Sequence, residues 1–181
     1  MRKQTALSFA LTAAVLLLFS SIPARAQASE EITQDKILAH SPAWQEKYDK
    51  YEPAADMLDA LRQKMGPGLE IDVYLGLWCP DSRNNVPLFI KIMDRLGSGT
   101  PVRYFDLPRK PSRDVKYYVE EFDVRRVPTF IFRRDSKEFG RIVENPKTGM
   151  LEDMLDIFFK TPEGEPDHGT ATRPVDAVPP R

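Results

Sequence analysis

The chain has 181 residues, of which 41% are hydrophobic and 29% are charged, and its formal net charge is −1. This size and balance fit one globular domain and exclude two full-sized ones. Acidic and basic residues are interspersed, which argues against partners such as nucleic acid and anionic lipid, whose binding rests on clustered Lys and Arg.

The first 26 residues have the three parts of a signal peptide. Arg2 and Lys3 give a basic start, residues 7–19 form a mainly apolar run, and residues 24–26 form a small-x-small cleavage site. The apolar run is too short to span a membrane. We therefore expect cleavage after Ala26 and an exported product that is periplasmic in a Gram-negative bacterium and secreted otherwise, without membrane contact after processing. Cleavage removes three basic residues and no acidic one, which takes the net charge from −1 to −4.

Composition divides the mature chain into three parts. Residues 27–41 are polar, and residues 161–181 contain five prolines and almost no large apolar residues. Neither end can bury enough apolar surface to offset the entropy of ordering, so both are predicted to be flexible. The folded domain is expected over residues 42–160, and it shows no internal repeat.

The first half of this domain alternates helical and strand patterns. Apolar spacings of three and four predict a helical face over 44–61, interrupted at Pro53. Residues 69–75 are short, apolar and partly β-branched, which predicts a buried strand. Residues 85–96 return to helical spacing and contain Pro87, which predicts a helix with a kink.

The second half continues this order. A strand at 102–107 is expected to lie parallel to the first, because a single crossover helix connects them. The remaining predicted elements are a helix from an N-cap at Ser112 to Phe122, a hairpin of strands 129–133 and 139–143, and a last helix at 149–159.

The single cysteine, Cys79, lies between the first strand and the following helix. At a helix N-terminus a sulfur atom faces unsatisfied N–H groups and the positive end of the helix dipole, which favours the nucleophilic thiolate. Asp81 opposes this effect by adding negative charge nearby. Alternatively, Cys79 is an inert half-buried thiol, and Asp81 is a first-turn acid that interacts with the helix dipole.

From residue 69 to residue 160 the sequence resembles the thioredoxin-like superfamily. Trp78-Cys79 matches the aromatic residue and first cysteine of its active-site loop, Pro87 its helix proline, and Val127-Pro128 the position of its cis-proline. The resemblance implies an α/β, thioredoxin-like fold, with a central mixed sheet and helices on both faces. It also implies a site in which Cys79 and Ser82 are catalytic and substrate is bound by Trp78, Pro80, Val127 and Pro128.

Two residues depart from the dithiol members of that superfamily. Ser82 stands where they carry a resolving cysteine, and a hydroxyl can donate a hydrogen bond to a thiolate but cannot attack a mixed disulfide. Val73 stands where they place a buried acid. These departures favour monothiol disulfide exchange of the isomerase or deglutathionylation type over net reduction. The expected partners are protein or low-molecular-weight thiols and disulfides, with glutathione as a potential co-substrate and no other cofactor.

Several alternatives stay open. Ser82 is equally an ordinary first-turn serine, Trp78 a cover for the core, and the whole domain a non-catalytic binding or scaffold module. The two histidines, His40 and His168, lie in or beside the expected flexible ends, so neither a metal site nor a hydrolase triad is expected. The arginine pairs at 125–126 and 133–134 are predicted to be solvated charge or, alternatively, to mark a surface for an acidic partner.

Overall fold

The computed structural model describes residues 31–110 and 113–160. The expected signal peptide, the segment 161–181 and the N-cap predicted at Ser112 lie outside these residues. The helices are α1 (Gln34–Leu38), α2 (Pro42–Lys50), α3 (Ala55–Lys64), α4 (Pro80–Leu96), α5 (Arg113–Phe122) and α6 (Met150–Lys160). The strands are β1 (Leu69–Leu75), β2 (Val102–Asp106), β3 (Thr129–Arg134) and β4 (Lys137–Val143).

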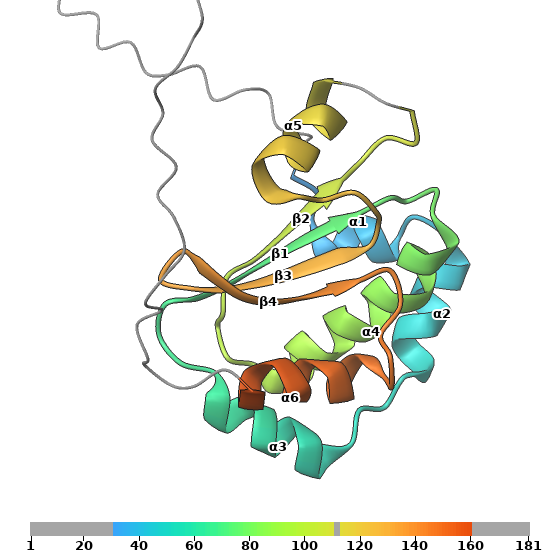
Figure 1. The fold of residues 1–181 in the computed structure, drawn as a ribbon. Helices are drawn as coiled ribbons and strands as arrows, with labels where there is room; N and C mark the ends of the chain where they lie inside the picture. Colours follow the sequence, from blue (N-terminus) through green and yellow to red (C-terminus); the bar gives the residue numbers. More distant parts are fainter. Residues whose placement is uncertain (1–30, 111–112, 161–181) are drawn as a thin grey trace, which may run out of the picture.

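The four strands form one mixed sheet in the order β2-β1-β3-β4. β1 and β2 are parallel, with Val73 opposite Tyr104, and the other two pairs are antiparallel. The parallel pair follows from the single crossover helix α4 between β1 and β2. Helices lie on both sides of the sheet (Figure 1), so the predicted α/β architecture and mixed sheet are confirmed.

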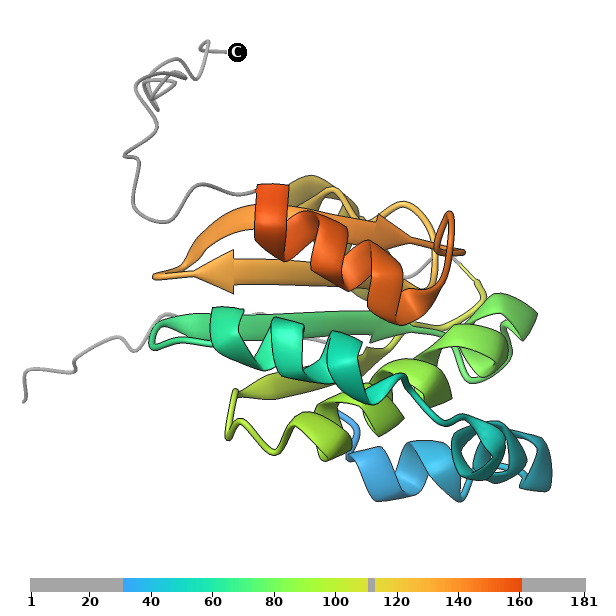
Figure 2. The same ribbon diagram turned by 90° about the horizontal axis from the view of Figure 1, so that it is seen from below.

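One face of the sheet carries the main core. Figure 2 shows α3, α4 and α6 in front of this face, and α1 and α2 lie beside α4. Phe89 of α4 meets Phe130 of β3 with ring centroids 5.0 Å apart. Burying side chains of this size contributes about 1.5–3 kcal/mol each. With a single cysteine the chain cannot form an internal disulfide bond, so the fold is stabilised by this core and its polar contacts.

The opposite face carries a smaller core under α5. Tyr74 of β1 stacks on Phe105 of β2 and tilts against Tyr118 of α5, with ring centroids 5.1 Å apart in both pairs. Leu107, Val124 and Ile131 complete this buried cluster beside Tyr74 and Tyr118. Because this second core is small, α5 does not cover the whole of this sheet face, and polar side chains occupy the rest.

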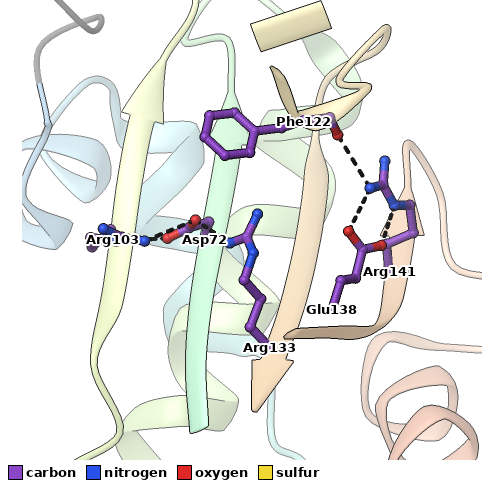
Figure 3. Close-up of polar contacts among 6 residues, drawn as sticks. All are labelled: Asp72, Arg103, Phe122, Arg133, Glu138 and Arg141. Carbon is purple, nitrogen blue, oxygen red and sulfur yellow. Dashed lines mark hydrogen bonds and ion pairs between the residues drawn. The ribbon is translucent and has the colours of Figure 1, made fainter. Parts of the chain in front are cut away.

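That polar part is centred on Asp72, whose side chain is only 2% exposed. Arg103 of β2 donates to its Oδ1 through Nε at 2.8 Å, and Arg133 of β3 donates to its Oδ2 (Figure 3). The solvated charge predicted at 133 is therefore wrong, because the Arg133 side chain is only 11% exposed. Strand alternation places Asp72 and Tyr74 on the same face, so a carboxylate is buried there and needs cationic partners.

Residues before position 42 also take part in the fold. Glu31 forms a bridge with Phe105, and Ile32 donates its N–H to the carbonyl of Tyr104 at 2.9 Å. In α1, Ile37 is fully buried. The flexibility predicted for 27–41 is therefore wrong from residue 31 onward, and 27–30 lie outside the described residues. The apolar residues of this segment pack on the main core, although the segment is polar on average.

The other differences concern element boundaries. The predicted face over 44–61 is two helices, α2 and α3, separated around Pro53, where a missing N–H interrupts helical hydrogen bonding. The hairpin turn is shorter than predicted and consists of Asp135 and Ser136, whose φ angles are 52° and 65°. Positive φ at both central residues fits the twist of a two-residue hairpin.

Asp153, in the first turn of α6, holds the loop that precedes this helix. Its carboxylate accepts hydrogen bonds from the backbone N–H groups of Lys147 at 2.7 Å and Thr148 at 3.1 Å. Partial burial alone would raise the pKa of Asp153, but these donors outweigh it and hold the pKa below its ordinary value.

We expect Asp153→Asn to lower the free energy of unfolding by about 1 kcal/mol near neutral pH. A carboxyl whose pKa is lowered by folding stabilises the protein above its unfolded pKa, and this contribution disappears as the pH falls through the folded pKa. The difference between variant and wild type should therefore narrow below about pH 4. Denaturant titrations in neutral and acidic buffer measure it, and a pH-independent difference would contradict the assignment.

Candidate active site around Cys79

Cys79 is the N-cap residue of α4, at the point where the chain leaves β1. Its backbone N–H donates to the carbonyl of Gly76 at 2.8 Å, and its carbonyl accepts from the backbone N–H of Arg83 at 3.1 Å. Its thiol Sγ lies 3.3 Å from the carbonyl oxygen of Val127, to which it donates. Cys79 is 7% exposed, so access to the sulfur depends on the cavity beside it.

Val127 belongs to the segment that enters β3. The peptide bond between Val127 and Pro128 is cis, at the position to which the sequence resemblance points. The carbonyl of Pro128 accepts from the N–H of Glu144 at 2.7 Å, and the hydroxyl of Thr129 donates to the carbonyl of Arg126 at 2.7 Å. These bonds fix the segment that faces Cys79.

Ser82 lies in the first turn of α4 and is fully buried. Its Oγ accepts a hydrogen bond from the N–H of Gly76 at 3.1 Å. Among the described residues no hydrogen bond joins the Ser82 hydroxyl to the Cys79 sulfur. The hydroxyl thus ties the loop before Cys79 to the helix after it, which matches the alternative of a structural first-turn serine.

Trp78 is 44% exposed, so it does not serve as a cover for the core. Its indole Nε1 donates to the carbonyl of Leu107 at 2.8 Å, which ties the Cys79 loop to the end of β2. The N–H of Leu77 reinforces this link by donating to Asp106 Oδ1 at 3.0 Å. A Cβ on Gly76 would lie 2.8 Å from the Trp78 ring, so this position requires glycine for the close approach.

A cavity of about 310 Å³ opens beside Cys79. Three of the predicted site residues, Trp78, Cys79 and Val127, line it. The other three do not line it: Pro80, the first residue of α4, is exposed, while Ser82 and Pro128 are buried. The cavity also has charged walls, made by Asp81, Arg109, Arg125, Arg126 and Glu144.

Sequence reasoning did not single out Arg109, Asn85 or Glu144 at this site. A signal existed for Arg109, because it follows a strand parallel to β1 and the carboxyl ends of parallel strands meet at one edge. Asn85 is 6% exposed, and its Nδ2 lies 3.1 Å from the carbonyls of both Asp81 and Glu144. Only the folded structure brings Glu144 to the start of α4.

No metal centre is apparent in the part of the chain that the structure describes, where no three His, Cys, Asp or Glu side chains are grouped to hold an ion. Val73 is fully buried in the main apolar core, so the position of the buried acid in the dithiol proteins is apolar here. Within the described ranges, no helix has the length and apolar character needed to cross a membrane.

Comparison with known proteins agrees with this arrangement. A family model described as Thioredoxin matches residues 26–156. No curated protein gives a match. Among solved structures, a protein of unknown function from Pseudomonas aeruginosa is 12% identical with a TM-score of 0.58, covering 71% of this chain and 92% of that one. An HIV epitope-scaffold is 12% identical with a TM-score of 0.53, covering 71% and 91%.

A thioredoxin from Fasciola hepatica is 20% identical with a TM-score of 0.40, covering 55% of this chain and 89% of its own. At these identities the similarity of the solved structures concerns the fold alone. The family model, by contrast, spans well over half of the chain. The chain therefore belongs to the thioredoxin family.

Proposed function

We propose that this protein is exported and performs monothiol disulfide exchange through Cys79. The observation that carries the proposal is the position of the Cys79 sulfur, at the N-terminus of α4 and 3.3 Å from the carbonyl of Val127, in the lining of an open cavity. A helix N-terminus stabilises negative charge on a sulfur atom, and the cavity gives a second sulfur atom a route to it.

The exchange has two balanced steps. After the Cys79 thiol has lost its proton to water, the thiolate attacks one sulfur of a disulfide, so that a Cys79–substrate disulfide forms and the other half leaves as a thiolate. An external thiolate then attacks the substrate sulfur of this mixed disulfide. The substrate leaves in a disulfide with the external thiol, and the Cys79 thiolate is regenerated.

The absence of a second cysteine determines which reactions this site supports. Net reduction by a dithiol requires a resolving thiol, and position 82 carries a hydroxyl that is already bonded to Gly76. Isomerisation and deglutathionylation need only the exchange described above, with a protein thiol or glutathione as the external partner. In an oxidising compartment the substrates available for this exchange are protein disulfides and mixed disulfides.

One observation favours the alternative of a non-catalytic binding module. Cys79 is 7% exposed, and its thiol is engaged with a backbone carbonyl, as a buried structural cysteine would be. Reaction would require the substrate sulfur to enter the cavity and displace this contact.

Turnover distinguishes the two functions. The assay follows release of a glutathionylated peptide, with reduced glutathione as the external thiol, in the presence of wild type or Cys79→Ser. We expect wild type to accelerate release and Cys79→Ser to show only the uncatalysed rate, while both keep the same circular dichroism spectrum. Equal rates with the two proteins would contradict catalysis and support the binding module.

A further inference from the structure

Two residues of opposite charge in the lining of the cavity beside Cys79 come from different elements of the fold. Arg109, in the loop after β2, lies over the Trp78 ring with its guanidinium carbon 5.7 Å from the ring centroid. Asp81 lies in the first turn of α4, two residues after Cys79. Both side chains line the cavity, so a disulfide that enters it meets a cation contributed by the loop after β2 and an anion contributed by α4.

The other cations of the lining have carboxylate partners. Arg126 is paired with Glu144 at 2.6 Å, and Arg125 with Asp123 at 2.5 Å. For Arg109, the described residues provide no carboxylate within ion-pair distance. Arg109 is thus the lining cation whose charge the surrounding described side chains do not neutralise.

The position of Arg109 is defined by a chain of contacts that begins at the reactive loop. Trp78 precedes Cys79 and is tied to the β2 end through Leu107. The Trp78 ring holds the guanidinium by a cation–π contact, and no described residue accepts a hydrogen bond from the N–H donors of Arg109, so they can pair with a carboxylate. A planar guanidinium binds a carboxylate through two parallel hydrogen bonds.

We propose that Arg109 is a specificity-determining residue that selects disulfide substrates carrying a carboxylate close to the disulfide bond. This inference rests on the proposed exchange at Cys79 and adds the substrate class. Asp81 strengthens the selection by repelling a carboxylate from the α4 side, so that an anionic substrate is oriented with its acidic group toward the end of β2. Acidic peptides and small anionic thiols such as glutathione share this chemistry.

Three small symmetric disulfides of similar length test the preference: anionic dithiodipropionate, neutral hydroxyethyl disulfide and cationic cystamine. The rate of adduct formation on Cys79 is followed by intact mass, and each rate is divided by that of a small neutral thiol with the same disulfide. This division removes differences in intrinsic reactivity. For wild type we expect the corrected rates to fall from the anionic to the neutral to the cationic disulfide.

Arg109→Gln should lower the corrected rate for the anionic disulfide about fivefold and leave the neutral rate unchanged. Lys110→Gln is the matched control, since it removes the same charge from the next residue, which does not line the cavity. Lys110→Gln should keep the wild-type order of corrected rates for the three disulfides. Arg109→Lys should retain part of the preference for the anionic disulfide. High salt should reduce the preference of wild type, because partly exposed charges are screened.

A second arm compares glutathione disulfide with a mixed disulfide of a glutamate-flanked peptide. Loss of rate in Arg109→Gln with either one supports the inference and identifies the source of the carboxylate. If all disulfides react and the Arg109→Gln variant has the same relative corrected rates as wild type, the inference is overturned. The proposed exchange at Cys79 then still stands. If no disulfide reacts with native Cys79, including the neutral one, both are overturned.

Discussion

Asp72→Asn is expected to lower the free energy of unfolding by about 3 kcal/mol, the largest effect on stability of the substitutions considered. Asp72 is 2% exposed and receives hydrogen bonds from Arg103 and Arg133 (Figure 3). Removing its charge leaves the Arg133 guanidinium, which is 11% exposed, without a compensating anion in a poorly solvated position. Denaturant unfolding of wild type and variant measures the loss.

Glu138→Gln provides the control on the same face of the sheet. Glu138 is paired with Arg141 at 2.6 Å, but its side chain is 33% exposed, and pairs open to solvent contribute about 0–1 kcal/mol (Figure 3). The double variant Asp72→Leu, Arg133→Met should recover much of the loss, because a buried ion pair and an apolar pair of similar volume have comparable free energies. Equal, small effects of Asp72→Asn and Glu138→Gln would contradict the buried cluster.

Ser82→Cys is expected to change the fate of the mixed disulfide on Cys79. In wild type the adduct should persist until an external thiol arrives, because position 82 offers no sulfur. In the variant the new thiol can attack Cys79 Sγ, so that the bound half leaves as a thiol and a disulfide forms between positions 79 and 82. Position 82 is three residues after Cys79 in the same helical turn, and both residues bond to Gly76.

Ser82→Ala is the matched control, since it removes the hydroxyl that accepts from Gly76 without adding a sulfur atom. Both variants leave this N–H without its oxygen partner and should lose about 1 kcal/mol of stability. Intact mass after treatment with a disulfide separates them: Ser82→Ala should retain the adduct, and Ser82→Cys should lose it and lack two hydrogens. An adduct that persists equally in both would mean that the two side chains cannot meet.

The sheet and most of its helices could be predicted because their patterns are local. β1 is a short apolar run, and α4 and α6 repeat apolar residues at helical spacing, so each segment carries its own signal. The position of Cys79 follows from the same patterns, since a strand-to-helix junction is visible in the sequence. The apolar spacing predicts a helix only from residue 85, whereas α4 begins five residues earlier, at Pro80, because polar residues occupy its first turn.

The remaining features depend on partners far along the chain. Arg133 appears as surface charge until the sheet brings it to Asp72, 61 residues away. α1 has five residues, too few for a periodic signal, and its burial depends on the core beneath it. The hydroxyl of Ser82 bonds to Gly76 because the loop between them turns back on itself, which sequence spacing does not determine.

The most direct test of exchange at Cys79 uses the folded protein and a neutral disulfide. Hydroxyethyl disulfide is added to wild type without denaturant, the intact mass is recorded, a small thiol is then added, and the mass is recorded again. We expect one added mercaptoethanol unit at Cys79 and its complete loss after the thiol. A mass that stays unchanged until denaturant exposes the sulfur would contradict exchange in the folded state and make Cys79 a buried structural residue.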